Sequence, residues 1–186
     1  STSDYMNQWA IRGAFFRLFY AYDDKYLVQV NGRYDGSSRL APGHKWVLFP
    51  SAALAWRVKE ESFLKDVDCL SNLKLRLGWG ITGNTAIDPY KTQGSLEYGR
   101  YSYGSNGVLA FYQKEMPNPN LSWEKTEQWN TGIDFGFLNG RIGGSVDLYL
   151  QNTNDLLMDR QLPVVSGFGN VTTNIGQIRN KGLEVT

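Results

Sequence analysis

The sequence contains one cysteine, one histidine and only six prolines in 186 residues. Cys69 cannot form an internal disulfide or a cysteine-based zinc site, so we interpret it as a buried or idle thiol. His44 lies in a Pro-Gly turn and is interpreted as a solvated loop residue, because a metal site or hydrolytic triad needs further partners. Asp134, Asp147 and Glu184 fall on polar strand faces, where carboxylates simply meet water. We therefore expect no metal, no cofactor and no catalytic residue, and not an enzyme.

Charge of one sign and long apolar runs are also missing. The net charge is +1 with 20% charged residues, which gives no electrostatic reason to expect nucleic acid as a partner. No stretch approaches the ~18 consecutive apolar residues that indicate a transmembrane helix. Barrel strands alternate between apolar and polar residues, and averaged hydropathy hides that pattern, so a membrane barrel stays compatible with the sequence.

Aromatic residues are abundant at 14%, and there are 20 glycines, a mixture typical of β-structure with many turns. The stretch LKLRLGWGITGN, residues 73–84, alternates without a break: leucines and Trp79 share one face, and Lys74 and Arg76 share the other. Such a period of two residues predicts a strand with one apolar and one polar environment.

The same stretch matches G-x-G-x-x-G at Gly78, Gly80 and Gly83, the spacing of a dinucleotide-binding turn. That motif requires a buried parallel strand before it and a helix after it. Charged residues on the strand and Pro89 behind it contradict both requirements. We interpret the glycines as strand positions that a bulky neighbour or a second backbone approaches closely.

Alternation recurs along most of the chain and predicts about seven strands, several of roughly 10–12 residues, the length that tilted strands need to cross a bilayer. Short connections at residues 23–25 and 139–140 alternate with long ones, as in outer-membrane barrels. Asn139-Gly140 is a typical type I′ hairpin pair. Residues 59–72 form a longer link on the short-turn side. The long loops are residues 37–45, 84–121 and 154–174.

Aromatic residues concentrate in one long loop and near the strand ends. The loop rings suit contact with sugars or peptides, and the alternative, which the composition favours, is a packed loop hairpin. These candidate ligand-binding residues are Tyr98, Tyr101, Tyr103, Phe111 and Tyr112. The strand-end rings are assigned to the aromatic girdles of a barrel. They include Tyr22, Tyr26, Trp46, Trp56, Trp123 and Trp129.

Several blocks together resemble the barrel of SusC/RagA-type TonB-dependent transporters, in that family's order and over almost the whole chain. They are YAYDDKYLVQVNGRYDGSSR, FPSAALAWRV, LKLRLGWGITGN, NPNLSWEKTEQWNTGIDFG, NTNDLL and NIGQIRNKGLEV. The resemblance implies an all-β fold: an antiparallel transmembrane β-barrel segment, about seven strands of a 22-stranded barrel in the outer membrane of a Gram-negative bacterium. Polar faces would line the lumen and apolar faces would meet lipid.

The resemblance also implies a function and partners. Such proteins import oligosaccharides or peptides with a SusD-like surface lipoprotein, energised by TonB. The short turns would face the periplasm and the long loops the exterior. Residues 1–186 are expected to be an interior part of the barrel domain, with the plug and TonB box outside this chain. Two alternatives are a soluble β-sandwich carbohydrate-binding module and a passive porin or adhesin barrel.

Overall fold

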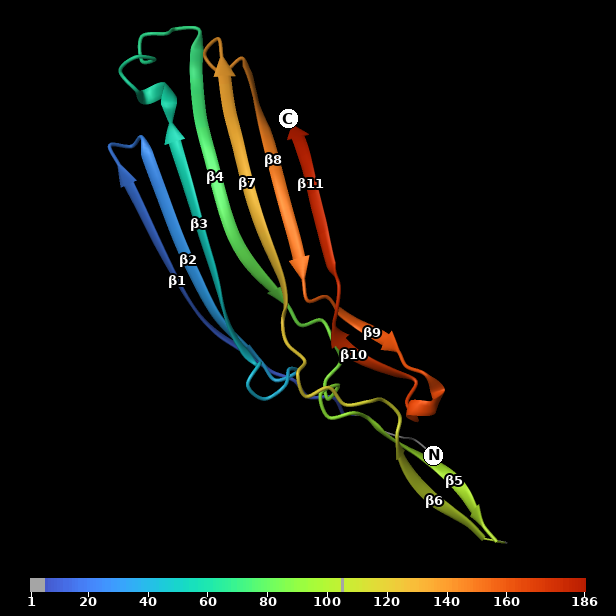
Figure 1. Ribbon diagram of the computed structural model, residues 1–186. Helices are drawn as coiled ribbons and strands as arrows, with labels where there is room; N and C mark the ends of the chain where they lie inside the picture. Colours follow the sequence, from blue (N-terminus) through green and yellow to red (C-terminus); the bar gives the residue numbers. More distant parts are fainter. Residues whose placement is uncertain (1–5, 105) are drawn as a thin grey trace.

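The computed structural model describes residues 6–104 and 106–186, and within them one antiparallel sheet of seven strands dominates, in the order β1-β2-β3-β4-β7-β8-β11 (Figure 1). This confirms the predicted all-β class, and the main sheet has the seven strands predicted, while four further strands lie in the long loops. The strands are β1 (Ile11–Tyr22), β2 (Tyr26–Ser37), β3 (Trp46–Arg57), β4 (Leu70–Asn84), β7 (Glu124–Phe137), β8 (Ile142–Asn154) and β11 (Gln177–Val185).

Two separate hairpins lie in the predicted long loops, at the end of the sheet opposite the short turns (Figure 1). The first pairs β5 (Leu96–Tyr103) with β6 (Asn106–Gln113), and the second pairs β9 (Leu157–Gln161) with β10 (Asn170–Asn174). Short 3₁₀ turns occur at Val58–Glu60 and Val164–Ser166. No helix in the described ranges is long and apolar enough to cross a membrane.

The two tight turns use positive backbone φ angles. Asp23 and Asp24 have φ of 51° and 49°, and the N–H of Lys25 donates to the carbonyl of Tyr22 at 3.0 Å. In the second turn the positive φ pair is Leu138 and Asn139, at 52° and 55°. The predicted central pair Asn139-Gly140 is therefore wrong by one position. Gly140 is the third of the four connecting residues, with a φ of 81°, and its N–H closes the turn on the carbonyl of Phe137 at 3.1 Å.

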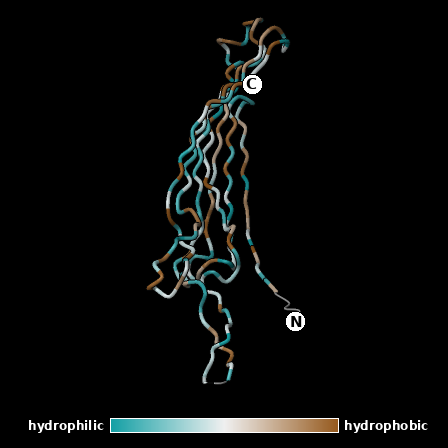
Figure 2. The backbone as a smooth tube through the Cα atoms, turned by 90° about the vertical axis from the view of Figure 1, so that its right-hand side faces the viewer, coloured by the Kyte–Doolittle hydropathy of each residue, from teal (hydrophilic) through white to brown (hydrophobic). Residues whose placement is uncertain are grey.

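The pairing register carries the alternation across the whole sheet. One row on the apolar face runs Val28, Leu54, Leu77, Thr131, Leu148 and Leu183, and a row on the polar face, three residues further along β2, runs Arg17, Asn31, Ser51, Gly80, Gln128, Gln151 and Asn180. Alternating colours along each strand show the same pattern (Figure 2). The structure thus confirms two different faces, each a continuous surface across the seven strands.

The apolar face has no protein layer against it among the described residues. Leu18, Leu148 and Leu183 are 63%, 53% and 61% exposed. The chain exposes 13363 Å² in total, whereas a globular protein of 21.0 kDa exposes about 9,000 Å². A β-sandwich would bury this face under a second sheet. The sandwich alternative is therefore wrong.

The small apolar core lies instead at the long-loop end of the sheet. It consists of Leu40, Phe49, Leu121 and Trp123. Trp123 is 5% exposed, packs edge-on against Phe49 with ring centroids 5.2 Å apart, and donates its indole N–H to the carbonyl of Lys45 at 2.9 Å. Its assignment to an aromatic girdle is wrong, because the preceding loop folds back and covers it.

The glycine motif lies inside β4, as the strand interpretation requires. A Cβ at Gly83 would overlap the ring of Phe49, and one at Gly80 would lie 2.9 Å from the Cβ of Ser51. These two positions confirm the predicted close approach. Gly78 differs, since the nearest atom to a Cβ there is 3.9 Å away. Its lack of a side chain opens space above the strand.

Candidate functional site

The centre of the polar face holds a cavity of about 290 Å³. Its floor has short side chains or none, at Ala53 on β3 and Gly78 on β4. Phe19 on β1 forms one wall, and Asn130 on β7 and Asp147 on β8 form the other. Phe19 is an exception to the alternation of β1, and the structure gives this exception a place beside the cavity.

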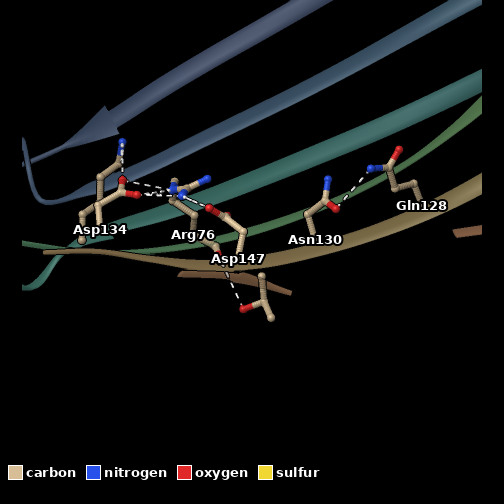
Figure 3. A network of polar contacts seen from close by, with 7 residues as sticks. Arg76, Gln128, Asn130, Asp134 and Asp147 are labelled. Carbon is tan, nitrogen blue, oxygen red and sulfur yellow. Dashed lines mark hydrogen bonds and ion pairs between the residues drawn. The ribbon is translucent and has the colours of Figure 1, made fainter. Parts of the chain in front are cut away.

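An ionic network borders the cavity and joins three strands (Figure 3). Nε of Arg76 on β4 donates to both carboxylate oxygens of Asp134 on β7 at 3.0 Å, and Nη2 donates to Asp134 at 2.6 Å and to Asp147 on β8 at 3.1 Å. Gly132 lies in the same row, and a Cβ there would collide with the Asp147 carboxylate. This glycine lets the bonds cross β7. Lys74 adds a weaker contact, 4.0 Å from Asp134.

Neutral amides and hydroxyls occupy the next level of the polar face. Arg17 Nε donates to Asn31 Oδ1 at 2.9 Å, and Asn31 Nδ2 donates to Ser51 Oγ at 3.1 Å. On β7, Gln128 donates to Asn130 at 3.2 Å (Figure 3). Together these side chains offer hydrogen-bond donors and acceptors, with Arg17 as one cation, beside an ionic network in which Lys74 and Arg76 balance Asp134 and Asp147. Such a surface suits neutral polar solutes such as sugars and peptide backbones.

Sequence reasoning placed Asp134, Asp147 and Arg76 on polar strand faces, but it did not link them. Their separation along the chain hides the link, since β7 follows β4 only after the long loop that contains β5 and β6. Once β4 and β7 are paired, the register places Arg76 opposite Gly132 and Lys74 opposite Asp134. The sequence did contain one signal of the link: a basic residue, Lys74, and an acidic residue, Asp134, each lie on the polar face of a strand, at positions that pair when the two strands meet.

The five loop aromatics lie on the β5–β6 hairpin, which projects beyond the sheet (Figure 1). The hairpin divides them between two faces: Tyr98 opposes Phe111 on one face, while Tyr101, Tyr103 and Tyr112 are on the other. All five are strongly exposed, from 52% for Tyr112 to 77% for Tyr103. Ser105 lies outside the described residues. The hairpin is thus present, but in this chain its rings are not packed into a core.

The short-turn end carries a different polar cluster. Tyr26 and Trp56 stack with centroids 6.2 Å apart, and both donate to Glu61 Oε1, at 2.6 and 3.0 Å. These hydrogen bonds, from Tyr26 first and Trp56 second, lower the pKa of Glu61 below its ordinary value of 4.5. The contacts therefore stabilise the fold above pH 4.5, and this contribution is lost as the pH falls through the lowered pKa.

The two residues interpreted as inert lie away from these clusters. His44 is exposed in the connection between β2 and β3, and its backbone N–H donates to Ala41 at 3.0 Å. Cys69 is exposed in the link before β4, so it is not a buried thiol. In the described ranges, no three His, Cys, Asp or Glu side chains gather closely enough to hold a metal ion.

Comparison with known proteins identifies relatives of the whole chain. SusC of Bacteroides thetaiotaomicron, a TonB-dependent receptor, is 47% identical over 179 residues, which are 91% of this chain and 17% of that protein. The TonB-dependent receptor P26 of Formosa agariphila is 39% identical over 183 residues, 98% of this chain and 18% of that protein. The chain thus spans less than a fifth of the length of these relatives.

Solved structures agree with the sequence relatives. The RagAB peptide transporter aligns with a TM-score of 0.84 at 31% identity, and the RagAB peptide importer in its open-open state with 0.85 at 30%. Each alignment covers 95% of this chain and 19% of the other. The family described as TonB dependent receptor-like, beta-barrel, matches residues 1–186. The chain therefore belongs to the TonB-dependent receptors, the β-barrel proteins of the Gram-negative outer membrane, as a partial barrel of seven strands.

Proposed function

We propose that the protein of which this chain forms a part imports a nutrient across the outer membrane, an oligosaccharide in preference to a peptide. It would act with a SusD-like surface lipoprotein and with energy passed from TonB through regions outside this chain. The observation that carries the proposal is the 47% identity to SusC over 91% of the chain. The two-faced sheet supports it, because an apolar face suits lipid and a polar face suits a lumen.

The chemistry of the polar face supports a neutral substrate. Gln128, Asn130 and Ser51 provide amide and hydroxyl groups, and the nearby charges of Arg76 and Asp134 are paired. Exposed tyrosines on the β5–β6 hairpin add flat rings with polar edges, which stack on sugars and hydrogen-bond their hydroxyls. Peptide import is the second candidate, since the RagAB peptide transporter shares the fold with a TM-score of 0.84.

In the proposed orientation, the short turns face the periplasm and the hairpins face outward. Cysteine labelling on whole cells tests this orientation. Each variant of the full-length protein keeps a single cysteine, and its other cysteines are replaced. Ser102→Cys on β5 should react with an impermeant maleimide, whereas native Cys69, exposed at the opposite end, should react only after lysis. The reverse pattern would contradict the orientation, and with it any contact between the hairpin and an external substrate.

The import proposal itself is tested by uptake in cells that carry the full-length gene. The double variant Tyr101→Ala, Tyr103→Ala should lower the apparent affinity for an oligosaccharide about three- to tenfold, the value of one aromatic contact or more. Val164→Ala, Val165→Ala is the matched control, because these side chains are 92% and 95% exposed on the other hairpin. An unchanged affinity would contradict the aromatic contact, whereas the lack of oligosaccharide uptake by the wild type, or uptake of peptides alone, would contradict the import proposal.

A further inference from the structure

The apolar face contains a groove of about 500 Å³ near the short-turn end. Two neighbouring rows of side chains line it, each running across the strands, and we call it the outer groove. Its lining side chains include Val28, Leu54, Leu75, Leu77, Thr131 and Ile133. Thr131 is short and lies in the same row as Leu77 and Leu148, so the surface is lowered where it stands.

The position of the outer groove restricts what can fill it. The groove belongs to the face that a TonB-dependent barrel turns toward the bilayer, so it is continuous with the lipid interface. The side chains of Val28, Leu54, Leu75, Leu77 and Ile133 in its lining are apolar, and a water molecule beside them would lack hydrogen-bond partners. The acyl chain of a neighbouring lipid can fill this space through van der Waals contacts and leaves no hydrogen-bonding group unpaired.

The end of the groove toward the short turns is polar. Tyr26 and Trp56 line this end and hold Glu61 through the hydrogen bonds of 2.6 and 3.0 Å. Lys25 pairs with Asp23 at 2.8 Å and lies 3.9 Å from Glu61. Because Asp23 is its closer partner, Lys25 only partly neutralises the negative charge of Glu61. Residues 23–25 and 57–68 carry six carboxylates against four basic side chains, so this end attracts cations.

We propose that the outer groove binds one acyl chain of a phospholipid whose ammonium head group contacts Glu61. Phosphatidylethanolamine fits this description, and an anionic phospholipid such as phosphatidylglycerol does not. The stacked Tyr26 and Trp56 rings lie where aromatic residues meet the head-group region, between the chain and the carboxylate. The site depends on the outer-membrane location of the family and not on the transported substrate.

Native mass spectrometry of the full-length protein, incubated with detergent micelles that contain phosphatidylethanolamine and phosphatidylglycerol, tests the chain-binding part. Thr131→Trp fills the groove and should reduce the retained lipid about threefold or more, because the indole ring replaces the packing contacts of the acyl chain. Leu148→Trp places the same ring one strand away and should retain lipid like the wild type. Equal retention in both variants would overturn the proposal, as would a dimer that Thr131→Trp dissociates, because a second barrel would then occupy the groove.

A second pair of variants tests the contact between Glu61 and the lipid head group. Glu61→Gln keeps an oxygen that accepts from Tyr26 and Trp56 but removes the charge, and it should lower the preference for phosphatidylethanolamine about two- to fivefold. Glu60→Gln removes the adjacent charge, which contacts Arg57 at 3.7 Å, and should leave the preference unchanged. Should Thr131→Trp fail to fold, a photoreactive phosphatidylethanolamine on the wild type decides the question. Adducts confined to residues 26–28, 54–56, 75–77 and 131–133 support the site, and adducts spread around the barrel overturn it.

Discussion

Arg76 shows what a single side chain does in this barrel wall. Its guanidinium bonds two carboxylates on two neighbouring strands, a planar arrangement of donors that a lysine cannot supply. The side chains of Arg76, Asp134 and Asp147 are 37%, 26% and 27% exposed, so the network is partly shielded. It therefore joins β4, β7 and β8 through side chains in addition to their backbone ladders.

Replacing Arg76 should destabilise the protein more than replacing its neighbour Lys74. Arg76→Met leaves Asp134 and Asp147 facing each other without their shared cation. We expect a cost of about 1–2 kcal/mol, between the values for exposed pairs and for broken buried pairs. Lys74→Met removes only the 4.0 Å contact to Asp134, and we expect less than about 0.5 kcal/mol. Thermal unfolding of the full-length protein in detergent measures both, and equal losses would show that the network contributes little.

At the scale of the element, β4 shows how well alternation predicts environment. Its leucines line the outer groove, while Arg76 and Gly78 border the cavity on the polar face. Strand identity, face and approximate length followed from the sequence because a strand repeats every two residues and a long barrel strand repeats many times.

The predictions that failed are those in which distant segments decide the structure. Trp123 has the sequence context of a girdle residue, but a loop folds over it and buries it beside Phe49. The second tight turn is displaced by one residue, because the pairing of Phe137 with Ile142 fixes a four-residue connection. Pairing of β4 with β7 across a long insertion, and hence the Arg76 network, needs tertiary information that no local pattern contains.

Two substitutions in β4 test the assignment of its faces. Leu75→Arg places a charge in the lipid-facing groove and should cost about 2–4 kcal/mol near the bilayer midplane, and less toward either interface. Gly78→Ser points toward the polar cavity, where the nearest atom to its Cβ is 3.9 Å away, and should cost far less. Refolding titrations of the full-length barrel into bilayers measure both variants. A larger loss for Gly78→Ser would contradict the barrel assignment of β4.

Gly83→Ser is the internal control for that comparison. Its Cβ would overlap the Phe49 ring, so it should destabilise the loop core although it adds only a small polar group. The three β4 variants therefore separate an effect of lipid contact from an effect of steric overlap. If Gly78→Ser and Gly83→Ser behaved alike, the open space above Gly78 would not exist in the folded barrel.

At the scale of the whole molecule, the seven strands form a wall and not a closed body. β1 pairs only with β2, and β11 pairs only with β8, so one side of each outer strand has no hydrogen-bonded neighbour within the described sheet. The apolar face is exposed over its full width. Both features are stable only where other strands continue the sheet and lipid covers the face, because open edges do not persist in hydrocarbon.

Residues 1–186 expressed alone should therefore aggregate in aqueous buffer. The exposed surface, 13363 Å² against the roughly 9,000 Å² of a globular protein of this mass, leaves large apolar areas that self-associate. Edge strands β1 and β11 add backbone groups that pair with further copies. Detergent alone should shield the apolar face without closing the edges, so only co-refolding with the remaining strands of the barrel should give a single species. Sedimentation velocity under the three conditions measures this, and a monodisperse, cooperatively melting chain in plain buffer would show that the apolar face is covered by the chain itself.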